Sequence, residues 1–163
     1  PSEEVQTNEG IYQEDGIPSG RYIHIIQTIS NDETDTENPN KTIKLAEVEV
    51  YGEVASIDLA RGKPVTGSSE SEEHGFVNLV DGSQATFAST LGEDSLEMDN
   101  MKIDLGYEEP IHQVVLFGTT GQLIGVKVHI LNDMGTIVRT TEPITSTTDV
   151  QTYDFTHQVP RWL

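Results

Sequence analysis

Residues 43–51 read IKLAEVEVY, and this stretch decides the fold. Ala46, Val48 and Val50 alternate with other side chains, so successive residues point to opposite sides of the chain, as they do in a β-strand. This apolar set predicts one buried face. The two glutamates of the stretch are expected on the other face, near the rim of a sheet or in solvent. The pattern therefore predicts a half-buried strand.

Similar short apolar runs recur along the chain and are bounded by Gly, Pro, Asn and Asp. They predict further strands at residues 21–29, 101–105, 111–117, 123–131, 136–140 and 150–155. Residues 132–135 (NDMG) are expected to join two strands as a hairpin, residues 76–80 to form one helical turn, and residues 66–75 to form a polar loop. No long stretch repeats a helical spacing. The sequence thus predicts an all-β sandwich of short antiparallel strands.

Length and charge limit the possible functions. The chain has 163 residues, a formal net charge of −19 and no cysteine. Its length predicts an acidic tail or linker at residues 1–20 and a single sandwich at residues 21–163. The charge argues against nucleic acid or anionic membrane as a partner. Because the chain begins with Pro1, we expect it to be processed or cut from a longer protein.

Five motifs are similar to those of a known domain family. They are RYIH at 21–24, LAEVEVYG at 45–52, DLARGKPVTGSS at 58–69, LVDGS at 79–83 and MKIDLG at 101–106. Together they resemble the discoidin domain, also called the coagulation factor 5/8 type C domain, over roughly residues 21–155. The resemblance implies the galactose-binding-like fold, a jelly-roll-like β-sandwich whose loops at one end form the ligand face.

The order of these motifs is unusual for that family. The motifs at 21–52 resemble its closing strands, whereas residues 55–155 resemble its opening half. We therefore expect either a circular permutation or a window cut from a tandem array, with both parts in one sandwich. The arrangement also resembles discoidin-like modules in proteins of large DNA viruses.

The resemblance implies a structural calcium ion beneath the ligand loops, as in fucose-binding lectins of this fold. The implied ligands are carboxylates from Glu47 and Asp81, carbonyls from Ala46, Asn78 and Ser83, and a further ligand from Ser89 or Thr90. Calcium takes six to eight such hard oxygen ligands. The alternative is that Asp81 only caps its own turn and Glu47 is a charge at a strand edge.

The resemblance also implies a sugar pocket, but the arginine pair of the fucose lectins is missing from residues 117–123. The remaining candidates for ligand contact are Glu73, His74, Phe76, Phe117 and Gln122. Aromatic faces stack on sugars while polar groups bind hydroxyls, although ordinary core packing is the alternative for the two phenylalanines. The loop at 66–76 is acidic, so binding to anionic lipid is not expected.

The sequence favours a binding protein over an enzyme. It has no cysteine nucleophile, no G-x-S-x-G, no H-E-x-x-H and no phosphate-binding loop. The leading hypothesis is a calcium-stabilised module that recognises a carbohydrate or glycoprotein on an extracellular or virion surface. The alternative is a structural protein–protein interaction domain, such as a capsid component that contacts neighbouring domains and has a degenerate sugar pocket.

Overall fold

The chain forms an all-β, antiparallel sandwich, as predicted. The computed structural model describes residues 16–29, 42–92, 98–118 and 121–156. The strands are β1 (Ser19–Gln27), β2 (Lys44–Leu45), β3 (Glu47–Tyr51), β4 (Val65–Gly67), β5 (Ala88–Ser89), β6 (Asn100–Pro110), β7 (Gln113–Phe117), β8 (Val126–Leu131), β9 (Ile137–Thr140) and β10 (Val150–Asp154). The expected helical turn is a 3-10 helix, η1 (Phe76–Val80). Within the described residues, no helix has the length and hydropathy needed to cross a membrane.

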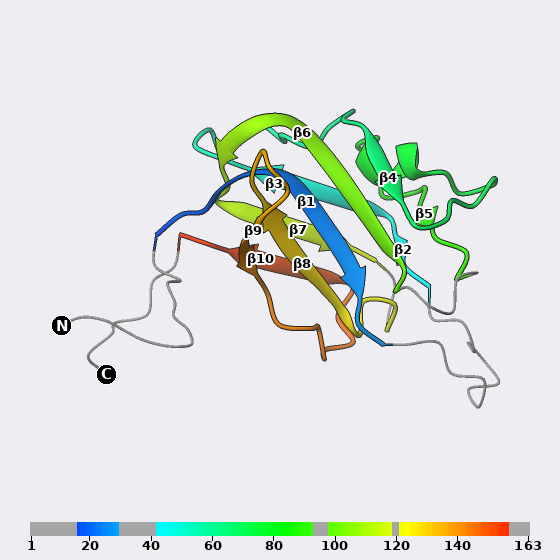
Figure 1. Cartoon of the computed structure of the whole chain (residues 1–163). Helices are drawn as coiled ribbons and strands as arrows, with labels where there is room; N and C mark the ends of the chain where they lie inside the picture. The colour runs from blue at the N-terminus through cyan, green and yellow to red at the C-terminus, as the bar shows by residue number, and fades with distance from the viewer. Residues whose placement is uncertain (1–15, 30–41, 93–97, 119–120, 157–163) are drawn as a thin grey trace.

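Two main sheets form the layers of the sandwich. The front layer in Figure 1 is a five-stranded sheet of order β4-β6-β1-β8-β9, and behind it lies a three-stranded sheet of order β10-β7-β3. The short strands β2 and β5 pair with each other beside η1 at one end of the sandwich. The expected hairpin joins β8 to β9.

Strand β1 is at the centre of the larger sheet because it pairs with β6 on one side and β8 on the other. Its alternation is regular: Ile23 and Ile25 are fully buried, whereas Tyr22 and His24 are only half-buried. Ile25 lies opposite Met101 of β6 and Val128 of β8, which are both fully buried. These inward side chains, with those of the smaller sheet, form one continuous core.

The described parts of segments 21–52 and 57–155 lie in the same sheets. Strand β1 pairs directly with β8, while β3 pairs with β7 of the facing sheet. Strand β1 begins at Ser19, and the Pro18 carbonyl accepts a hydrogen bond from Ile111 N–H at 2.9 Å. The last residues of the predicted tail, 18–20, therefore belong to the sandwich. Residues 1–15 of that tail and residues 157–163 lie outside the described residues.

The alternation in residues 43–51 changes phase in its middle, and one part of the prediction is wrong. Glu47 is 1% exposed instead of lying at the rim or in solvent. Leu45, which precedes the phase change, is buried. Ala46 N–H donates to the Phe117 carbonyl at 2.7 Å, and Glu47 is paired with that same residue. Two residues thus oppose one, which is the geometry of a β-bulge and explains why Leu45 and Val48 both face the core. Glu47 remains on the opposite face, where the turn that contains Gly82 covers it.

Strand β4 was expected to be part of a polar loop, but it pairs with β6 along the edge of the larger sheet. Gly67 permits this pairing. A Cβ at this position would overlap the Asn100 carbonyl oxygen and would lie 2.7 Å from the Phe76 ring. The close approach of two backbones therefore requires glycine here.

Replacing Gly67 by alanine should destabilise the protein. Because one obstacle is backbone, β4 must move, and we expect Gly67→Ala to lower the free energy of unfolding by about 1–3 kcal/mol. Urea denaturation followed by circular dichroism measures this loss. The control is Thr66→Ala, whose side chain is exposed on the same strand. Equal stability of the two variants would contradict the close approach.

Candidate functional site

The carboxyl group of Glu47 is the centre of the candidate site. It lies at the start of β3, directly after the bulge, and one oxygen, Oε2, accepts a hydrogen bond from Gly82 N–H at 2.9 Å. The other oxygen, Oε1, is buried and has no hydrogen-bond partner among the described residues. A buried polar atom without a partner costs free energy, so it indicates a missing ligand or proton.

The turn that faces Glu47 follows η1. Asp81 uses Oδ1 to accept from Ser83 N–H at 2.9 Å and Oδ2 to accept from the Thr86 hydroxyl at 2.7 Å. Asp81 therefore caps its own turn, as the alternative proposed. Each carboxylate oxygen has a second lone pair, so capping does not prevent a further ligand from binding.

Two further carboxylates lie close to Glu47. Glu47, Glu49 and Asp58 each offer one oxygen, and these atoms lie within 4.8 Å of one another. Asp58 is held by two backbone donors, since its Oδ1 accepts from Val50 N–H and Ala60 N–H, both at 3.0 Å. Its Oδ2 is buried without a hydrogen-bond partner among the described residues.

The negative charge of this group is only partly compensated, by the Arg61 guanidinium, which lies against Gly82. Arg61 approaches Asp58 with 3.7 Å between Nε and Oδ2, but the arginine side chain is 55% exposed. Burial raises the pKa of Glu47 to about 8, and the neighbouring Asp81 and Asp58 act in the same direction. The Glu49 carboxylate accepts a 2.6 Å hydrogen bond from the Tyr51 hydroxyl and raises the pKa of Tyr51 to about 12. The four carboxylates thus favour a proton or a cation between them.

The donors fit a hard divalent cation. They are all oxygens, which calcium and magnesium prefer, whereas zinc and copper favour nitrogen and sulfur. The buried Glu47 Oε1 has no hydrogen-bond donor among the described residues, and Asp81 is close enough to share a proton or an ion with the Glu47 carboxyl group. Glu47, Glu49, Asp58 and Asp81 are the carboxylates that would hold the ion.

The predicted calcium ligands are only partly brought together. The structure places Glu47 against the turn of Asp81 and Ser83, and Ala46 precedes Glu47 in the chain. The Asn78 side-chain amide donates to the Phe87 carbonyl at 3.1 Å, which fixes η1 against the following loop. The Thr90 hydroxyl is engaged elsewhere, because it accepts from Ile43 N–H at 2.9 Å and bonds to Asp99.

One predicted ligand-binding residue forms a loop platform with an unpredicted neighbour. The His74 ring stacks on Phe87 with 3.9 Å between centroids and 21° between planes. Lys44 Nζ lies 5.9 Å from the centre of the Phe87 ring. We call these three residues the loop platform. Glu73 is exposed beside it in the chain. In the chain, η1 lies between His74 of the platform and Asp81 of the candidate cation site.

Other predicted contact residues lie differently. Phe76 is 4% exposed and packs in the core, as the core-packing alternative states. Phe117 is half-buried on β7, opposite Glu47 and Val150. Gln122 is half-buried before β8. No described hydrogen bond or ring contact joins these two residues to the loop platform.

Sequence reasoning missed Glu49, Asp58 and Phe87 as site residues. The signal for Glu49 was present, because residues two apart in a strand share a face and Glu47 was already a candidate. Asp58 is recruited by the bridge between Tyr51 and Asp58, which depends on tertiary folding. Phe87 lies in a loop with no periodic signal.

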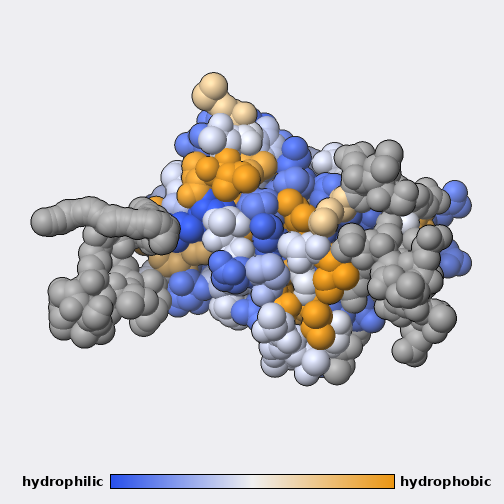
Figure 2. Space-filling view, turned by 60° about the horizontal axis from the view of Figure 1, so that its bottom comes forward, coloured by the Kyte–Doolittle hydropathy of each residue, from blue (hydrophilic) through white to orange (hydrophobic). Residues whose placement is uncertain are grey.

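The surface in Figure 2 has several small apolar patches separated by hydrophilic residues. Such scattered apolar side chains are normal for a globular protein. The polar cluster around Glu47 and the loop platform are therefore the better functional candidates. No protein-family model matches the chain, and comparisons with curated proteins and with solved structures find no match.

Proposed function

We propose that this chain is a non-enzymatic, calcium-stabilised binding module that recognises a carbohydrate or glycoprotein on an extracellular or virion surface. The observation that carries the proposal is the buried Glu47 carboxyl, whose Oε1 lacks a partner among the described residues beside three other carboxylates. A bound divalent cation would supply positive charge there and fasten β3 to the turn after η1.

Calcium is the best match among the hard cations. Its coordination is flexible and combines carboxylates with carbonyls and water, whereas magnesium demands a near-ideal octahedron. The carboxylates here come from a strand, a turn and a loop, and Asp58 and Asp81 also accept backbone hydrogen bonds. Such an irregular set suits the more tolerant ion.

The loop platform is the proposed contact surface for sugar. Its stacked pair, His74 and Phe87, is half-buried, and Lys44 lies beside it. An aromatic surface with nearby donors can bind the apolar and hydroxyl faces of a sugar ring together. Asn78 bonds to the Phe87 backbone, so a cation at the adjacent turn would also steady the platform.

A catalytic role for the carboxylates has less support. A raised carboxyl pKa is also typical of a general acid, but such a group must come within hydrogen-bond reach of a substrate. Glu47 is 1% exposed, and β3 and the 81–83 turn enclose it. A buried carboxyl group can bind a small ion, but it cannot protonate a substrate that does not reach it.

A glycan array probed in calcium and again in EDTA tests the proposal. We expect selective binding in calcium, loss of binding in EDTA, and at least tenfold weaker binding by Phe87→Ala, since stacking contributes roughly 1.4 kcal/mol or more. Tyr107→Ala is the control, because Tyr107 is a 62% exposed aromatic residue on β6.

Two outcomes would overturn the proposed function. Glycan binding that is equal in calcium and EDTA would remove the role of the ion. Absence of glycan binding by the folded protein would favour the structural alternative, a protein–protein interaction domain of a capsid or virion surface.

A further inference from the structure

The outer face of the five-stranded sheet has an unusual charge balance. The whole chain has 28 acidic and 9 basic residues. Directly paired residues share a face of an antiparallel sheet, so the strand register defines a row across all five strands. That row is Thr66, Lys102, His24, His129 and Thr140. It contains basic and neutral side chains only, and we call it the central row.

The neighbouring row on one side contains a second lysine, Lys127, and the row on the other side contains an acidic residue, Asp104, that is paired with an arginine. Ile26 of β1 lies between Asn100 and Lys127, which places this lysine beside the central row. On the other side Tyr22 lies opposite Asp104. In the part of the chain that the structure describes, neither Lys102 nor Lys127 forms an ion pair with a carboxylate.

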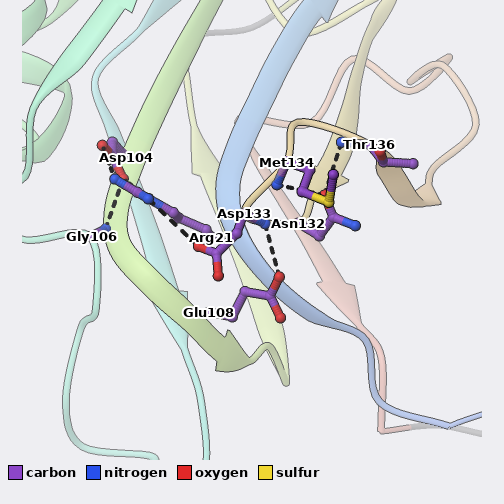
Figure 3. A network of polar contacts seen from close by, with 8 residues as sticks. All are labelled: Arg21, Asp104, Gly106, Glu108, Asn132, Asp133, Met134 and Thr136. Carbon is purple, nitrogen blue, oxygen red and sulfur yellow. Dashed lines mark hydrogen bonds and ion pairs between the residues drawn. The ribbon is translucent and has the colours of Figure 1, made fainter.

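Asp104 is already engaged, as Figure 3 shows. Arg21 donates to both of its oxygens, from Nε at 2.9 Å and from Nη2 at 3.2 Å. The same guanidinium reaches Asp133 at 3.5 Å. A bidentate arginine contact largely satisfies the charge and the hydrogen-bonding capacity of a carboxylate. Lys102 Nζ lies 5.3 Å from the centre of the Tyr22 ring, a contact that needs no carboxylate partner, so its ammonium can still meet an external anion.

The two histidines lie next to each other and keep hydrogen-bonding capacity. Their ring centroids are 6.3 Å apart. The Asn100 amide donates to the Met98 carbonyl at 3.3 Å, which turns its oxygen toward His24, at 3.1 Å from Nε2. His24 Nε2 is then the donor, and Nδ1 retains a lone pair. The face thus mixes charged and neutral polar groups.

We propose that this face binds an acidic polysaccharide, with Lys102 and Lys127 contacting its carboxylate or sulfate groups. The central row spans roughly 19 Å, from strand spacings of about 4.8 Å. That length suits several sugar units of an extended chain. The threonine hydroxyls and imidazoles supply the neutral partners that sugar hydroxyls need. This site is separate from the loop platform and uses no metal.

An acidic peptide fits the face less well. Peptides that bind sheets usually add a strand to an exposed edge, where main-chain groups are free. The central row crosses β6, β1 and β8, whose flanks are already paired with neighbouring strands. This face offers a ligand side chains only, and these are a mixture of hydroxyl, imidazole and ammonium groups.

Binding should strengthen as the pH falls. Burial lowers the pKa of both histidines, and Lys102 lowers that of His24 while Lys127 and His24 lower that of His129. The groups around the pair are Lys102, Asn100, Lys127, Tyr22 and the two threonines, with Asp104 bound to Arg21. Both imidazoles are neutral at neutral pH and gain charge in acid, which adds attraction for an anion.

The test measures binding of the full chain to immobilised heparin, alginate, neutral dextran and polyglutamate by biolayer interferometry. We expect binding to heparin and alginate and none to dextran. Lys102→Gln and Lys127→Gln should each weaken binding about tenfold, the effect of losing one charge-assisted contact. Lys63→Gln, with the same charge change in the loop before β4, should leave binding within about twofold.

The pH dependence of binding is tested with a double variant that carries His24→Gln and His129→Gln. As the pH falls below neutral, the parent should gain affinity for heparin, and the double variant should lose most of that gain. Equal losses for Lys63→Gln and Lys102→Gln would overturn the site. Tighter binding to polyglutamate than to either polysaccharide would overturn the sugar class. Absence of binding to every anionic probe would overturn the proposal, whatever the result for calcium.

Discussion

Calcium should raise the melting temperature of this protein at pH 8, and Glu47→Gln should abolish that response. At 100 times the dissociation constant, an ion that binds only the folded state adds about 2.7 kcal/mol. For a domain of this size that is a rise of roughly 5–10 °C. Differential scanning calorimetry in calcium and in EDTA measures it.

The metal-free protein should also lose stability as the pH rises. Burial raises the pKa of Glu47 from 4.5 to about 8, so between these values the folded state holds a proton that the unfolded state has released. Stability then falls with rising pH, by at most about 1.4 kcal/mol per unit, and levels off above pH 8. The pKa of Asp81 is lowered, so its contribution is lost only in stronger acid.

Calcium replaces this proton, so it should flatten the pH dependence. Metal ligands must be deprotonated, and binding to Glu47 therefore tightens as the pH rises towards 8. Glu47→Gln mimics the protonated carboxyl: its oxygen can still accept from Gly82 N–H, and its amide can donate to Asp81. The variant should fold without metal and show no slope from this position.

Glu53→Gln is the matched control, because it removes the same charge from an exposed turn. It should retain both the calcium response and the pH slope. A calcium response that survives in Glu47→Gln would place the ion elsewhere. A parent protein with equal melting temperatures in calcium and EDTA would remove the cation from the proposal.

Most of the strand content could be predicted from the sequence, because alternation and turn residues are local signals. Strand β1 illustrates this, with Ile23 and Ile25 buried and His24 between them half-buried. The bulge at Ala46 could not be predicted, since it arises where the chain meets Phe117 of β7. It changes which side of the chain Leu45 faces, whereas Glu47 stays on the face opposite Val48 and is buried there by the turn that contains Gly82.

The candidate site was partly predictable for the same reason. Glu47 and Asp81 belong to recognisable motifs, whereas Asp58 joins them through a bridge to Tyr51 that no local pattern encodes. The residues of the outer sheet face could not be grouped from the sequence either. His24 and His129 are 105 positions apart in the chain and become neighbours only through the register of β1 and β8.

Ile25→Ala should cause the largest loss of stability among the variants considered. Ile25 is fully buried in the central strand and lies opposite Met101 and Val128. Truncation removes buried methyl groups and leaves a cavity between two sheets, so we expect a loss of about 2–5 kcal/mol. Since small proteins have a total stability of roughly 5–15 kcal/mol, this is a large fraction. Urea denaturation followed by circular dichroism measures it.

This variant also tests whether residues 21–52 and 57–155 form one cooperative unit. If β1 completes the core, Ile25→Ala must weaken the single unfolding transition of the whole sandwich, with an unchanged dependence on urea. Ile137→Ala is the control, because that isoleucine is 52% exposed on the edge strand β9, and its loss should stay below about 1 kcal/mol. Two separate transitions, with residues 57–155 still folded after β1 has detached, would show that the segment from 21 to 52 is an addition to a self-sufficient domain. A single weakened transition would show that the sandwich cannot close without it, as a permuted order of strands requires.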